Sequence, residues 1–68
     1  MVGREKPPLT ERDVLIEFQQ VGSIIRVCAI DPQTRTEVVI QGPATAGRAT
    51  LTRNAVAKLN YMLRKGSA

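Results

Sequence analysis

Between residues 14 and 41 the sequence alternates apolar and polar side chains across two successive turn signals. Gly22-Ser23 suits a two-residue hairpin turn, because glycine supplies the positive φ that a type II′ turn needs at its first central position. With that turn, Phe18 faces Val27 across the two strands. The pattern predicts an antiparallel hairpin with one apolar face, which a slip of one residue would destroy.

The second turn signal is Asp31-Pro32-Gln33-Thr34, in which proline pre-sets the φ of the first central residue. In that register Val27 also faces Val38, and Ile25 faces Ile40. Both hairpins then place their apolar residues on one face, so we expect a three-stranded antiparallel β-meander. The predicted inner face carries Ile16, Phe18, Ile25, Val27, Ala29, Val38 and Ile40.

A helix is predicted from Leu51 to Lys65, where the apolar period changes from two to 3.6. Thr50 or Thr52 can cap its start, and Gly66 suits the residue after its end. Its apolar arc consists of Leu51, Ala55, Val56, Leu59, Met62 and Leu63. The connector before it, 41–48, lacks a Gly-Lys-Ser/Thr run, which argues against a phosphate-binding loop.

The sequence thus predicts one α+β domain of order β-β-β-α over residues 13–66, with the helix packed on one face of the sheet. Residues 1–12 are expected to be a mobile tail, because they carry charges and a Pro-Pro pair. Thr10 could instead cap a helix start. A strand is the preferred interpretation of residues 14–18, which are dense in β-branched and aromatic side chains.

A chain of 68 residues buries a small share of its surface and commonly needs a disulfide, a metal or a partner subunit as support. Cys28 is the only cysteine and there is no histidine, so an intrachain disulfide and a structural zinc site are excluded. We expect no metal and no cofactor. Oligomerisation is the support that remains, and the expected partner is a second copy.

One helix covers only one face of a three-stranded sheet, so the second face of the predicted sheet must meet either water or a partner. Val21 sits opposite Ile24 and Leu15 opposite Ile30, so apolar pairs occur at both ends of the first hairpin. A contiguous patch of this kind indicates an interaction surface, although single apolar residues on a surface are ordinary. The open edges of the first and third strands offer a second way to pair. The candidate interface residues are Leu15, Val21, Ile24, Cys28, Ile30 and Val39.

Little in the sequence suits catalysis. Histidine, the commonest general base, is absent. Cys28 is expected directly opposite Glu37, whose negative charge disfavours a thiolate nucleophile. Glu17 and Glu37 lie on different edge strands, two spacings of roughly 4.8 Å apart, which is too far to share a proton. We therefore predict that the protein is not an enzyme.

The formal net charge is +4, which modestly favours acidic partners. Four basic residues occupy the outer face of the predicted helix: Arg53, Lys58, Arg64 and Lys65. Weak, salt-dependent nucleic-acid binding by this face is therefore an alternative prediction. The second sheet face carries only Arg26 as a base and no aromatic residue on which nucleobases could stack.

No segment approaches the roughly 20 apolar residues of a membrane span. Residues 1–10 also lack the apolar stretch of a signal peptide. A cytoplasmic protein with a reduced thiol and no membrane partner is expected.

Four runs carry a likeness to known proteins: residues 17–22 (EFQQVG), 29–31 (AID), 36–44 (TEVVIQGPA) and 57–65 (AKLNYMLRK). Together they resemble a family of short, uncharacterised alphaproteobacterial proteins, a domain of unknown function. The resemblance implies a bacterial cytoplasmic setting and no known activity, and it transfers no functional residue. The leading hypothesis is a non-catalytic homodimer or protein-interaction module that uses the second sheet face or an edge strand.

Overall fold

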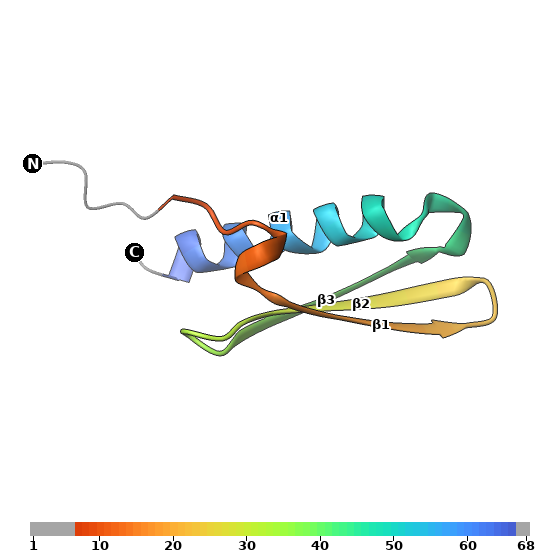
Figure 1. Cartoon of the computed structure of the whole chain (residues 1–68), viewed down its shortest axis with the longest axis horizontal. Coiled ribbons are helices and arrows are strands. Elements are labelled where there is room, and N and C mark those ends of the chain that lie inside the picture. Colours follow the sequence, from red (N-terminus) through yellow and green to blue (C-terminus); the bar gives the residue numbers. More distant parts are fainter. Residues whose placement is uncertain (1–6, 67–68) are drawn as a thin grey trace, which may run out of the picture.

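A computed structural model describes residues 7–66. Strands β1 (Leu15–Val21), β2 (Ile24–Asp31) and β3 (Thr36–Pro43) form one antiparallel sheet of order β1-β2-β3, and helix α1 (Arg48–Gly66) lies on one face of it (Figure 1). Two short 3-10 helices flank the sheet: η1 (Glu11–Asp13) precedes β1, and η2 (Ala44–Ala46) joins β3 to α1. The predicted β-β-β-α order is confirmed.

The first hairpin has the predicted register. Phe18 pairs with Val27, and Leu15 pairs with Ile30. Gly22 adopts a φ of 60°, as the two-residue turn requires.

The second hairpin differs from the predicted register by two residues. Val27 pairs with Ile40 rather than Val38, and Ile25 pairs with Gly42 rather than Ile40. The reason is a longer loop, in which Asp31 pairs with Thr36. Because the shift is an even number of residues, every side chain keeps its predicted face.

Asp31 organises this longer loop. One carboxylate oxygen accepts from the backbone N–H of Gln33 at 3.0 Å, and the other accepts from the Thr34 hydroxyl at 2.9 Å. The backbone N–H of Arg35 donates to the Asp31 carbonyl at 2.7 Å, and Arg35 takes a φ of 64°. The side chain of Asp31 is buried, so these hydrogen bonds replace its contact with water.

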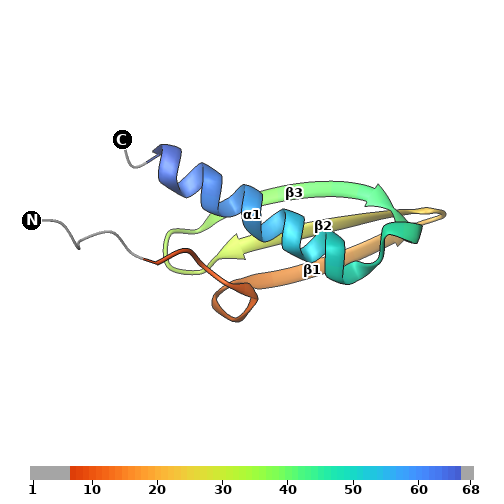
Figure 2. The same ribbon diagram turned by 90° about the horizontal axis from the view of Figure 1, so that it is seen from above.

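The core lies between α1 and the part of the sheet formed by β2 and β3. Figure 2 shows α1 running obliquely over the strands, and it packs mainly against β2 and β3. Of the predicted inner face, Ile16 and Ile40 are half-buried, and Phe18 on β1 remains 38% exposed. The buried apolar residues are Val14, Ile25, Val27, Ala29, Val38, Leu51, Ala55, Val56 and Leu59.

Helix α1 begins at Arg48, three residues before the predicted start. Gly47 precedes it with a φ of 87°, and its carbonyl accepts from the N–H of Leu51 at 3.2 Å. Thr50 and Thr52 therefore lie inside the helix rather than capping it, and Gly66 is its last residue. The early start follows from a glycine that can turn the chain sharply, a signal that the apolar period alone does not contain.

The chain before β1 packs on the domain. The backbone N–H of Leu9 donates to the side-chain oxygen of Asn60 at 2.8 Å, and the Asn60 amide donates back to the Leu9 carbonyl at 2.9 Å. Thr10 and Asp13 form a capping box around η1, after which the predicted strand follows. The predicted tail thus includes a docked segment, whereas its residues 1–6 lie outside the described residues.

Candidate interaction surface on the sheet

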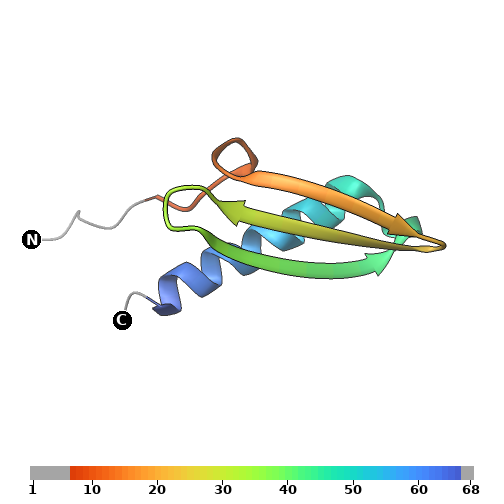
Figure 3. The same cartoon turned by 90° about the horizontal axis from the view of Figure 1, so that it is seen from below.

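The sheet face opposite α1, called the open face from here on, is not covered by any element of residues 7–66 (Figure 3). Three of the six candidate interface residues on it are exposed: Leu15 by 56%, Val21 by 67% and Ile24 by 43%. The other three, Cys28, Ile30 and Val39, are half-buried by their neighbours. The exposed members therefore lie on β1 and at the start of β2.

A polar row divides the open face. Gln19, Arg26 and Gln41 are aligned across the three strands. On one side of this row Val21 pairs with Ile24, and on the other side Leu15 pairs with Ile30. The candidate interface residues thus form two clusters at opposite ends of the face, rather than one contiguous apolar patch.

Cys28 lies at the centre of the open face. Its direct partner on β3 is Val39, not Glu37 as the sequence suggested, because of the two-residue shift in the second hairpin. The Glu37 carboxylate nevertheless reaches diagonally to accept a hydrogen bond from the Cys28 thiol at 2.9 Å. Burial, followed by the Glu37 hydrogen bond and the negative charge of Glu37, raises the pKa of this thiol from 9.0 to about 11. At neutral pH the thiol is therefore protonated and a poor nucleophile.

The outer edge of β1 is the least protected part of the sheet. None of the seven residues of β1 is buried, and only Ile16 is half-buried. The strand contains no lysine or proline, the residues with which edge strands commonly prevent pairing. On the helix side, Ile16 packs against the core, and the Arg48 guanidinium lies 5.0 Å from the centre of the Phe18 ring.

The outer edge of β3 is better protected. Lys58 of α1 reaches over it, and its ammonium group donates to the carbonyl of Val39 at 3.4 Å. The strand also ends in Gly42 and Pro43, and proline cannot donate to a neighbouring strand. An added strand would therefore meet fewer obstacles at β1 than at β3.

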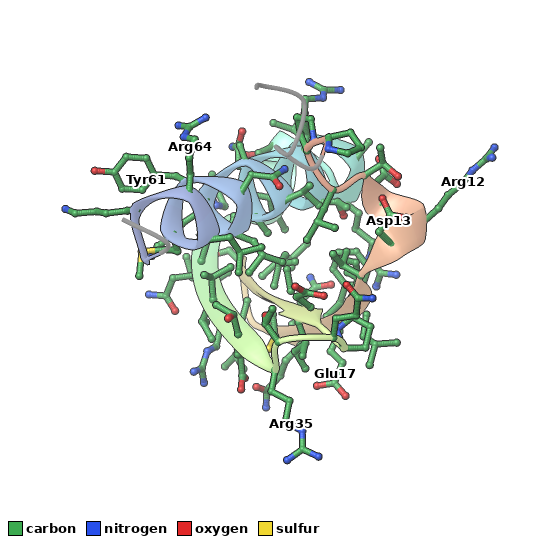
Figure 4. The ribbon with its side chains drawn as sticks, turned by 90° about the vertical axis from the view of Figure 1, so that its left-hand side faces the viewer. Arg12, Asp13, Glu17, Arg35, Tyr61 and Arg64 are labelled. Atoms are coloured by element: carbon green, nitrogen blue, oxygen red, sulfur yellow. The ribbon has the colours of Figure 1, made fainter. Side chains whose placement is uncertain are left out.

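The four basic residues of the alternative prediction are all exposed on α1. Lys58 is engaged with β3, and the ammonium group of Lys65 lies 5.7 Å from the centre of the Tyr61 ring. Figure 4 shows Arg64 pointing away from the sheet. Arg53 lines a shallow groove between η1 and α1, together with Arg12. The basic residues therefore present charge without forming a single concave site.

Metal-ligating side chains do not gather in groups of three or more anywhere in residues 7–66. Over the same range, no helix combines the length and the apolar character needed to cross a membrane.

A three-stranded meander with one helix on one face defines a small α+β domain with an open edge strand at β1. The chain belongs to the family described as Domain of unknown function (DUF6898), whose model matches residues 11–66. The match begins at η1, so the family unit includes the turn that precedes β1. No curated protein and no solved structure matches the chain.

Proposed function

We propose that the protein is a non-catalytic module that forms a homodimer through the edge of β1. The observation that carries this proposal is that β1 is an edge strand in which no residue is buried and only Ile16 is half-buried. Leu15 and Val21, at its two ends, are 56% and 67% exposed. An edge strand of seven residues in this condition is a template for another strand.

Energetics favour the edge over the open face alone. Each apolar side chain that becomes fully buried contributes roughly 1.5–3 kcal/mol before the cost of association. Strand pairing at β1 would add backbone hydrogen bonds to this term, whereas face-to-face stacking would bury the polar row of Gln19, Arg26 and Gln41. The edge therefore offers more favourable contacts for a smaller desolvation cost.

The protonated thiol of Cys28 and the absence of histidine from the sequence support a non-catalytic role. We extend the proposal to a bacterial cytoplasmic setting, which suits a single reduced cysteine.

The test is the solution mass measured by light scattering from low to high micromolar protein. We expect the wild type to dimerise and the double variant Leu15→Lys/Val21→Lys to be monomeric with an unchanged circular dichroism spectrum. The control Ile24→Lys/Val39→Lys carries the same added charge on β2 and β3, so it should retain more of the dimer. A wild type that stays monomeric at high micromolar concentration contradicts the proposal.

Nucleic-acid binding by Arg53, Lys58, Arg64 and Lys65 is the second candidate. Their exposure supports it. It ranks lower because Lys58 and Lys65 already make contacts within the chain.

A further inference from the structure

We infer that two copies join as one six-stranded sheet, through antiparallel pairing of β1 with β1 in a single register that places Phe18 on the two-fold axis. This inference rests on the proposed self-association and specifies its geometry. A two-fold axis perpendicular to the sheet makes neighbouring strands antiparallel and keeps both helices on the same side. Phe18 is the middle residue of Leu15–Val21, so this register pairs all seven residues of each strand.

The apolar clusters of the open face become continuous in this register. Leu15 of one copy lies opposite Val21 of the other, and these are the two most exposed large apolar side chains of the sheet. Val21 already pairs with Ile24 on β2, and Leu15 pairs with Ile30. Each row then runs Ile24–Val21 in one copy and Leu15–Ile30 in the second, with four apolar side chains in line. The symmetry produces this row twice.

In the same register, the polar row of each copy lies beside a charge of opposite sign on the second copy. Gln19 lies opposite Glu17 of the second copy, and Gln19 already pairs with Arg26. Arg26 and Glu17 of the second copy are therefore separated only by Gln19, within reach of a long arginine side chain. Opposite charges on the two copies approach each other without any pair of like charges meeting directly.

On the helix side, the two Phe18 rings meet at the axis. Phe18 is 38% exposed in the single chain, and aromatic pairs across strands are favourable. Arg48 lies over this ring, so the two guanidinium groups would both approach the axis. Arg48 is exposed and can turn aside.

Neighbouring registers lack these matches. With Glu17 on the axis, two carboxylates would face each other directly. With Gln19 on the axis, Leu15 would lie opposite Ser23 in the turn and Glu17 opposite Val21. The central register alone combines full overlap, apolar partners for Leu15 and Val21, and a neutral partner for Glu17.

Disulfide cross-linking tests the register. On a Cys28→Ser background, the single variants Leu15→Cys and Val21→Cys are mixed and oxidised with oxidised glutathione. We expect a cross-linked dimer in the mixture and none with either variant alone. Directly opposed strand residues have the Cα spacing of a disulfide, whereas the same residue of two copies would lie about 20 Å apart.

The outcomes separate this inference from the proposed function. A wild type that stays monomeric overturns both. A dimer in which Leu15→Cys cross-links with Ser23→Cys, or with neither partner, overturns the register alone and leaves self-association standing.

Charge variants at Gln19 provide a second test. Gln19→Glu would face Arg26 within its own chain and Glu17 in the other, so the fold should be unharmed while the dimer dissociation constant rises about 2- to 30-fold. Gln19→Lys should lower the dimer dissociation constant, because the lysine would face Arg26 in its own chain and Glu17 in the second copy. A merely structural role would move monomer stability and association together. Matching signs in light scattering and in thermal unfolding, the latter measured at a concentration low enough for the chain to be monomeric, would therefore overturn the register.

Discussion

Strands β1 and β3 both lie at an edge of the same sheet, yet α1 packs far more closely against β3 than against β1, where only Ile16 is half-buried. Val38 of β3 is buried, whereas no residue of β1 is. Lys58 reaches over the outer edge of β3, while the edge of β1 contains no lysine or proline. One helix is too narrow for three strands, so the strand it leaves uncovered is where a second copy can add stability.

The largest expected effect is on the buried residues beneath the helix, where a charged substitution should unfold the domain. Val27 on β2 is fully buried, so Val27→Asp would bury an unpaired carboxylate and should unfold the domain, at a cost above about 4 kcal/mol. Arg26→Gln, one residue away on the open face, should leave the fold intact. Circular dichroism checks both variants, and the opposite pattern would invert the assigned faces.

A smaller effect is expected where β3 touches the helix. A methyl group at Gly42 would lie 2.7 Å from a terminal carbon of Leu51, which is 4% exposed and has little room to move. Gly42→Ala should therefore lower the free energy of unfolding by about 1–3 kcal/mol in urea denaturation. Gly66→Ala is the matched control, because its added methyl group meets nothing within 4 Å. Equal stability of the two variants would mean that α1 does not press on β3.

The pKa of the Cys28 thiol reports on two carboxylates, Glu37 on β3 and Glu17 on β1. Its pKa is raised from 9.0 to about 11, so the protonated thiol stabilises the fold below pH 9, and this contribution is lost as the pH rises toward 11. Glu37 on β3 acts through a hydrogen bond and charge, whereas Glu17 on β1 acts through charge alone.

Glu37→Gln should therefore lower the thiol pKa more than Glu17→Gln does. Thiolate absorbance, measured as the difference from Cys28→Ser, gives both values. An equal shift in the two variants would contradict the hydrogen-bonded geometry.

The smallest effect is expected on the outer face of α1. The proposed function predicts no binding to duplex or single-stranded nucleic acid at tens of micromolar protein in fluorescence anisotropy at low salt. The alternative predicts a log–log salt slope of about −3, which Arg53→Gln/Lys58→Gln would flatten by nearly two units, at roughly −0.9 per phosphate. The slope thus distinguishes phosphate binding from a solvated helix face.

Side-chain alternation was enough to assign the fold and the two faces of the sheet. A register shift of one residue would move the apolar side chains from the core face to the solvent face. The Gly22-Ser23 turn also set the β1–β2 register correctly. The β2–β3 register was missed because Asp31 holds a longer loop through its side chain, and alternation cannot detect a shift of two.

The candidate site was predicted in part. The sequence identified Leu15, Val21 and Ile24, which are exposed. It could not show that a polar row separates the two clusters, since the alignment of Gln41 depends on the missed register. Phe18 was assigned to the core, and only the oblique path of α1 explains why its ring stays partly exposed.

The two hydrogen bonds between Leu9 and Asn60 join residues 51 positions apart, whereas both hairpins join close neighbours in sequence. Short loops close quickly, so the hairpins can form before the helix docks, and the Leu9 segment can attach only after the helix is in place. The same order applies in reverse when the domain opens. The amide hydrogen of Leu9 should exchange with solvent far sooner than those of β2, with the segment opening as a separate unit while the sheet remains folded.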